Sequence, residues 1–139
     1  MTWVERQPLR GGALIVRVRR IEVAPRSWTI TAEIANRSAT TVRIGRRQPR
    51  DFRKCVTSIV RYVRTKRAYG STINRQDFFP LTFRPALPRM LAPGKIWRGT
   101  FGSRGVLPKG QDMFVCYGFF TTAEDPDGFS LISERSFRA

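Results

Sequence analysis

Residues 27–36 constrain the fold most, because apolar and polar side chains alternate there without interruption. The intervening positions carry hydroxyl or carboxylate groups. Successive side chains of a β-strand point to opposite faces, so the pattern predicts a strand with one buried face and one exposed face. The apolar parity is occupied by Trp28, Ile30, Ala32 and Ile34.

Similar patterns predict further strands on both sides of this one. Before it, the apolar parity changes between residues 14–18 and residues 21–23, which predicts a one-residue β-bulge near Arg19 and Arg20. After it, a turn leads into a short alternating strand that contains Val42 and Ile44. Later strands are expected over residues 96–101, 113–120 and 129–133.

Two segments lack a clear alternating pattern. In residues 51–69, the β-branched residues favour a strand over residues 56–66, whereas the apolar spacing and Asp51 as a cap fit a short helix near residues 51–68. Residues 78–94 contain four prolines, so they are expected to form an extended surface connection and not a central strand.

The whole chain, residues 1–139, is expected to form a single domain, in which residues 1–12 are a flexible N-terminal segment. Its 139 residues and 41% apolar content are sufficient for one hydrophobic core. Seven or eight strands joined by short connections, without a repeat, predict an all-β fold, specifically an antiparallel β-sandwich.

The strand expected at residues 113–120 is apolar on both parities. Such a strand lies either at the centre of a sheet, with both faces covered, or partly in an interface between subunits. The sequence leaves both interpretations open, and the second predicts an oligomer formed through Met113 to Phe120.

Positive charge is concentrated in the middle of the chain. Between Arg37 and Arg104 there are 17 Lys or Arg residues and two acids, a local net charge of +15 out of +16. A surface of this kind attracts an anionic polymer or an acidic partner. An arginine-rich composition without a binding role also fits, since 22 of the 26 basic residues are Arg. The residues expected to form the polyanion- or partner-binding face are Arg43, Arg46, Arg47, Arg50, Arg53, Lys54, Arg61, Arg64, Lys66 and Arg67.

Residues suited to catalysis or metal binding are scarce. The chain has no histidine, which removes the commonest general base and the commonest metal ligand. We therefore expect no catalytic, cofactor or metal site, and no enzyme activity. Cys55 and Cys116 are too far apart in sequence for a zinc-binding pair. They form either a disulfide, which requires an oxidising compartment, or two buried thiols.

Three short turn-and-strand motifs occur along residues 13–133. They are the alternating strand that ends in Asn36-Arg37-Ser38, the Pro93-Gly94 turn that leads into a strand with Trp97, and Leu107-Pro108 before the aromatic strand. Together they resemble the immunoglobulin-like accessory domains of bacterial exported and cell-envelope proteins. The resemblance implies an immunoglobulin-like β-sandwich without catalytic residues, acting in protein or envelope contacts.

These observations predict a non-catalytic, immunoglobulin-like interaction module that is exported or associated with the cell envelope. The arginine-rich face is expected to contact protein subunits or an anionic polymer. The alternative is a cytoplasmic β-domain that binds nucleic acid without sequence preference, through its phosphates. No apolar run approaches the roughly 20 residues of a membrane-spanning helix, and residues 1–12 lack the pattern of a signal peptide.

Overall fold

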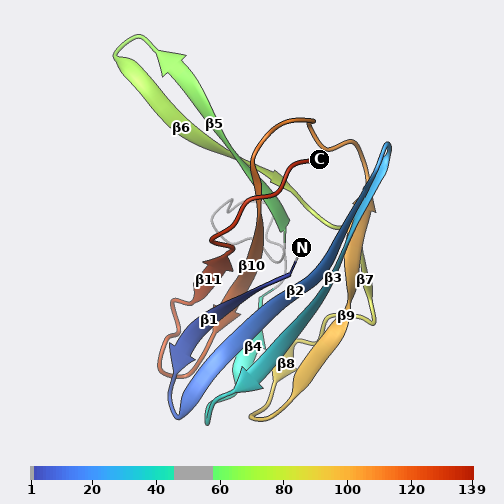
Figure 1. Cartoon of the computed structure of the whole chain (residues 1–139). Coiled ribbons are helices and arrows are strands. Elements are labelled where there is room, and N and C mark those ends of the chain that lie inside the picture. The colour runs from blue at the N-terminus through green and yellow to red at the C-terminus, as the bar shows by residue number, and fades with distance from the viewer. Residues whose placement is uncertain (1, 46–57) are drawn as a thin grey trace.

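The computed structural model describes residues 2–45 and 58–139, which form two antiparallel β-sheets (Figure 1). One of the two sheets curls into a half-barrel. The first sheet has the strand order β1-β2-β3-β9-β7. Its strands are β1 (Trp3–Leu9), β2 (Gly12–Ala24), β3 (Ser27–Arg37), β9 (Ile96–Arg104) and β7 (Thr82–Arg84).

The second sheet is built around β10 and has the order β6-β5-β10-β4-β8, with β11 also paired to β10. Both β5 and β11 pair with Cys116, and both β4 and β11 pair with Phe120. Because a strand has only two edges, β4 and β5 follow each other along one edge of β10 and β11 lies on the other. The strands are β6 (Gly70–Phe78), β5 (Ser58–Arg67), β10 (Met113–Thr121), β4 (Val42–Ile44), β8 (Met90–Leu91) and β11 (Phe129–Ile132).

The core lies between the two sheets and is rich in aromatic side chains. The ring of Phe101 on β9 makes edge contacts with Trp28 on β3, at 6.3 Å, and with Tyr117 on β10, at 6.2 Å. All three side chains are almost completely buried. These contacts tie the alternating strand of the first sheet to the central strand of the second.

The alternating strand and its bulge are confirmed. β3 spans Ser27–Arg37, and Ile30 and Ile34 are fully buried, as the alternation predicts. The register between β2 and β3 shifts between Val18 and Arg20, at the position where the apolar parity changes. Strand pairing therefore absorbs one extra residue and keeps both apolar runs of β2 against β3.

The all-β prediction is confirmed, but the number of strands is wrong: there are eleven in the described ranges, not seven or eight. Residues 58–67 form β5, so the helix alternative is wrong there, and residues 51–57 lie outside the described part. Residues 3–9, expected to be flexible, form β1 because their backbone pairs with β2 from Trp3 to Leu9. The proline-rich segment adds β7 and β8, two short strands between its prolines, each at the edge of its sheet, so the segment forms no central strand, as predicted.

Two of the predicted motifs contact each other. The side-chain amide of Asn36, which is fully buried, donates hydrogen bonds to the carbonyl oxygens of Thr40 at 2.8 Å and Leu91 at 2.9 Å. Its own carbonyl oxygen accepts from the backbone N–H and the hydroxyl of Ser38. The backbone oxygen of Asn36 also accepts from Gly94 N–H at 2.8 Å. One buried amide thus joins the end of β3 to the turn before β9.

The doubly apolar strand is central. β10 has partners on both edges, and Met113, Val115 and Tyr117 on one face are fully buried in the main core. Cys116, on the other face, is buried against Val60 of β5. These contacts within the chain bury residues of both parities, as a central strand requires, while an oligomer formed through Met113 to Phe120 stays a prediction. Within the described ranges, no helix is long and apolar enough to cross a membrane.

Candidate polyanion-binding site

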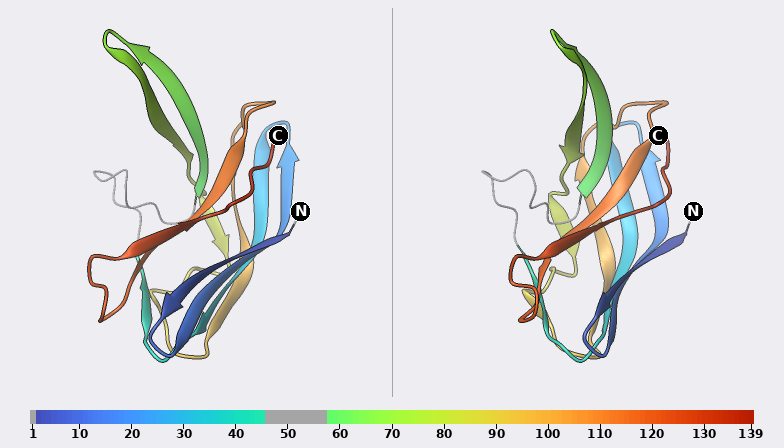
Figure 2. Two further views of the ribbon diagram at one scale, coloured as in Figure 1. Left: turned by 60° about the vertical axis from the view of Figure 1, so that its left-hand side comes forward. Right: turned by 90° about the vertical axis from the view of Figure 1, so that its left-hand side faces the viewer.

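The β5–β6 hairpin projects from the body of the molecule (Figure 1). β5 pairs with β10 only from Ser58 to Arg61, whereas it pairs with β6 as far as Arg67. β6 pairs with no strand other than β5 among the described residues. Both views in Figure 2 show the hairpin rising away from the two sheets. We call residues 62–75, beyond the last residue of β5 that pairs with β10, the ribbon.

The ribbon carries four cations and no acid: Arg64, Lys66, Arg67 and Arg75. Directly opposed residues in an antiparallel pair lie on the same face. The register sets Tyr62 opposite Arg75 and Arg64 opposite Ile73, so the face that holds Arg64, Lys66 and Arg75 carries three of the cations. Arg67, on the other parity, lies opposite Gly70 at the turn. Positive charge is therefore present on both faces and on both strands.

Two tyrosines mark the ends of the ribbon. At its base, Tyr62 makes an edge contact with Phe114 of β10 at 5.7 Å and still exposes 45% of its surface. At its tip, Tyr69 is fully exposed in the two-residue turn between β5 and β6. Arg61, just below the ribbon, donates a hydrogen bond to the side-chain oxygen of the opposite Gln76. The first acid after the ribbon is Asp77, which lies opposite Val60 at the base.

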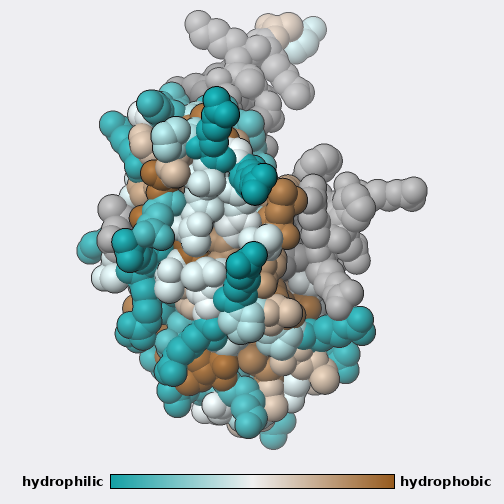
Figure 3. Space-filling view, turned by 90° about the vertical axis from the view of Figure 1, so that its right-hand side faces the viewer, coloured by the Kyte–Doolittle hydropathy of each residue, from teal (hydrophilic) through white to brown (hydrophobic). Residues whose placement is uncertain are grey.

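On the body of the molecule, several cations are paired with acids. Glu33 of β3 accepts hydrogen bonds from Arg98 at 2.8 Å and from Arg19 at 3.2 Å. Burial of Glu33 raises its pKa, but the hydrogen bonds and charges of the two arginines outweigh this effect and hold the pKa below its usual value. Further ion pairs join Arg20 to Glu22 and Arg138 to Asp112. On the face in Figure 3, hydrophilic side chains form separate groups among apolar ones.

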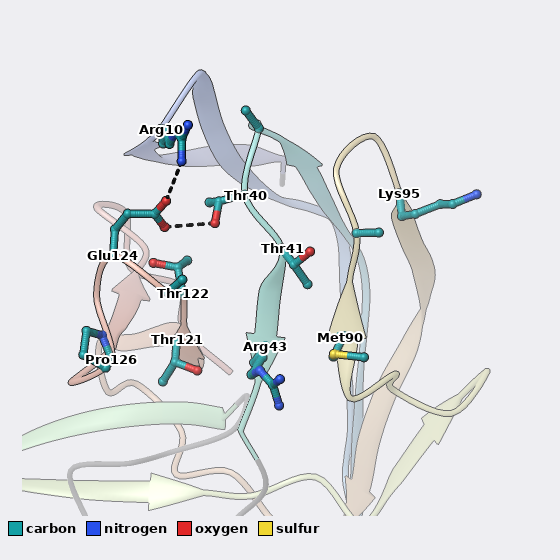
Figure 4. Close-up of a pocket in the computed structure, with 13 residues that line it drawn as sticks. Arg10, Thr40, Thr41, Arg43, Met90, Lys95, Thr121, Thr122, Glu124 and Pro126 are labelled. Carbon is teal, nitrogen blue, oxygen red and sulfur yellow. Dashed lines mark hydrogen bonds and ion pairs between the residues drawn. The ribbon is translucent and has the colours of Figure 1, made fainter.

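A groove of about 1040 Å³ lies near Arg10, Thr40, Arg43, Lys95 and Glu124 (Figure 4). Thr40 Oγ1 donates to one carboxylate oxygen of Glu124 at 2.9 Å, and Arg10 Nη1 donates to the other at 3.4 Å. A hydrogen bond from its own backbone N–H, followed by those from Thr40 and Arg10, holds the pKa of Glu124 below its usual value. Arg43 lies on β4 and Lys95 in the turn before β9, and their side chains point in different directions, so the groove presents no converging set of charges.

The structure brings together only part of the predicted basic face. Arg61, Arg64, Lys66 and Arg67 all lie on β5. Arg43 lies opposite Thr121, at the far end of β10 from the ribbon, about 27 Å away for eight residues of strand. The remaining predicted residues lie outside the described part of the chain: Arg46, Arg47, Arg50, Arg53 and Lys54. Cys55 also lies outside the described part, so neither alternative for Cys55 and the buried Cys116, a disulfide or two thiols, is tested.

Sequence reasoning missed β6, and with it Arg75. β6 contains few apolar residues, so it shows no alternating pattern, and pairing with β5 is what makes it a strand. The available signal was Gly70, three residues after Arg67, since a short loop that contains glycine between two strands favours a hairpin. Gly70 has a φ of +131°, which suits glycine.

Within the described ranges, no group of three or more Cys, Asp or Glu residues is placed to hold a metal ion. The Tyr117 hydroxyl is buried in the core, and burial raises its pKa far above its usual range, so it stays protonated. No family model matches the chain, and no curated protein matches it either.

Proposed function

We propose that this protein is a non-catalytic binding module that binds an anionic polymer through the ribbon. The observation that carries the proposal is the run of four cations without an acid on a hairpin that leaves the body of the molecule. Like charges at this density repel one another, and a polyanion relieves that repulsion.

The shape of the ribbon favours a polymer over a folded protein partner. Residues two apart on one strand lie about 7 Å apart on the same face, so Arg64 and Lys66 form a row that can follow regularly spaced anions. A stable protein–protein interface instead buries roughly 800 Å² on each partner around an apolar or aromatic centre. At the tip, Tyr69 is the one aromatic side chain between Tyr62 and Phe78.

The finer assignment of the fold and the location are also part of the proposal. The two antiparallel sheets and the contact between Asn36 and the Pro93-Gly94 turn support an immunoglobulin-like sandwich. An exported or envelope-associated location goes with that resemblance, and a cytoplasmic location with the nucleic-acid alternative. Fractionation of cells that express the native gene separates the two locations.

The test measures heparin binding over a salt series for three proteins: wild type, a ribbon variant and a control variant. The ribbon variant carries Arg64→Gln, Lys66→Gln and Arg75→Gln. The control variant carries Arg26→Gln, Arg89→Gln and Lys95→Gln, three exposed cations outside the ribbon. Both variants lower the net charge from +16 to +13, so a difference between them is due to position and not to total charge.

The proposal predicts that the ribbon variant binds heparin more weakly and with a flatter salt dependence than the control variant. Each anion that the protein neutralises releases counter-ions, which makes affinity fall as salt rises. If the two variants bind equally, the cations act only through bulk charge and the proposal is wrong.

A further inference from the structure

We infer that the anionic polymer is duplex DNA and that the ribbon enters its major groove. The inference rests on the proposed function and specifies its ligand. It follows from three features of the ribbon: its isolated edges, its dimensions, and the distribution of cations over both faces.

The ribbon has two open edges. Among the described residues, β5 beyond Arg61 pairs with no strand except β6, and β6 pairs with no strand except β5. The backbone N–H groups along the outer edges are therefore not used in a third strand pairing. Backbone N–H groups are common donors to the phosphates that line a groove.

The dimensions of the ribbon suit the major groove. Two paired strands lie about 4.8 Å apart, and the groove of B-form DNA, about 12 Å wide and 8.5 Å deep, admits a two-stranded ribbon. The six residues from Tyr62 to Arg67 extend about 20 Å, more than the depth of the groove. The hairpin can therefore reach the base edges before the body meets the phosphate backbone.

The distribution of residue types favours a groove over a flat surface. A groove has phosphates on both walls, and the ribbon has cations on both strands and both parities. A membrane-binding hairpin would need one apolar face, but the apolar residues Val63 and Ile73 lie on opposite faces. Between the cations lie residues that can donate and accept hydrogen bonds, as base edges require: Thr65, Ser71, Thr72 and Asn74.

The same reasoning separates DNA from other polyanions. The major groove of an A-form RNA duplex is deep and too narrow for side chains to read, so the ribbon should bind an RNA duplex of equal length more weakly. A flexible sulfated glycan has no groove, so its sulfate groups can contact only one face of the ribbon at a time. Affinity for duplex DNA should therefore exceed affinity for both at the same salt concentration.

The experiment combines binding with chemical footprinting. A 20-base-pair DNA duplex, an RNA duplex of the same length, heparin and vesicles with anionic lipid are titrated with wild type, ribbon variant and control variant at the same salt. Methylation of guanine N7 by dimethyl sulfate, a reaction in the major groove, is then measured on the DNA with and without protein.

The expected result is protection of guanine N7 by wild type and by the control variant, with about tenfold weaker DNA binding and no protection for the ribbon variant. If heparin binding depends on the ribbon but guanine N7 stays reactive, the groove inference is wrong and the proposed function stands. Tighter binding to vesicles or RNA than to DNA also overturns the inference. If no ligand distinguishes the ribbon variant from the control variant, both proposals are wrong.

Discussion

Arg61 lies opposite Met113, and this is the last position at which β5 pairs with the body of the molecule. Met113 is the first residue of β10 and is fully buried, whereas β5 beyond Arg61 pairs only with β6. The pairing of β5 with the two-sheet body therefore ends, and the ribbon begins, at this residue pair. Stability should depend on the residues below this pair, and polyanion binding on the residues above it.

Asn36→Ala should destabilise the fold by about 2–4 kcal/mol, because it removes the amide that donates to the carbonyl oxygens of Thr40 and Leu91 and accepts from Ser38. Urea unfolding followed by tryptophan fluorescence measures the change in the free energy of unfolding. Ser38→Ala, which removes one partner of the same amide, should cost about 1 kcal/mol. Equal effects of the two substitutions would contradict the role of Asn36 as the centre of this network.

Glu33→Gln should lower the free energy of unfolding by about 1–2 kcal/mol at pH 7, because Arg19 and Arg98 lose their charged acceptor. The folded state holds the pKa of Glu33 below its unfolded value. The stabilisation is therefore complete above the unfolded pKa, about 4.3, and is lost as the pH falls through the lower, folded pKa. Unfolding of wild type and variant at pH 7 and at pH 2–3 measures this difference.

The matched control for Glu33 is Glu22→Gln. Glu22 also pairs with an arginine, Arg20, but both side chains are more than half exposed. Exposed ion pairs contribute little, so the change should stay below about 0.5 kcal/mol at either pH. A loss for Glu33→Gln that persists unchanged at acid pH would show that packing, and not charge, explains its effect.

Tyr117→Phe should leave stability unchanged or increase it, by up to about 1 kcal/mol. The hydroxyl is buried, and no residue of the described ranges accepts from it or donates to it. A buried polar group without a partner costs free energy, and its removal preserves the ring contact with Phe101. Thermal unfolding measures the change. A clear loss of stability would mean that the hydroxyl has a hydrogen-bond partner in solution.

The sequence predicts the sheets best where one face of a strand is buried. Alternation identifies β3 because Ile30, Ala32 and Ile34 belong to the core, whereas Thr31 and Glu33 lie on the other parity. β10, which is largely buried, is recognised because it is apolar on both parities. The bulge in β2 is visible because a change of parity has no other simple explanation in a continuous strand.

Strands that form mainly because they pair with a neighbouring strand are not predicted from the sequence. β1 contains Glu5, Arg6 and Pro8, and only pairing with β2 makes it a strand. The polar residues of β6 likewise form a strand because they pair with β5. The basic face was therefore predicted on one strand and its adjoining loops. In the structure, Arg43 of β4 lies opposite Thr121, at the far end of β10, whereas Arg64, Lys66 and Arg75 lie on the ribbon.

The most direct test of the central claim is a ribbon truncation. Deleting residues 64–73 and joining Val63 to Asn74 through Asn-Gly keeps a cross-strand pair and a favoured two-residue turn. The deletion removes three cations, so the net charge becomes +13, as in the control variant. We predict unfolding within about 1 kcal/mol of wild type, with at least about tenfold weaker polyanion binding and a flatter salt dependence than the control variant. A folded truncation that binds as tightly as the control variant, with the same salt dependence, would contradict the account.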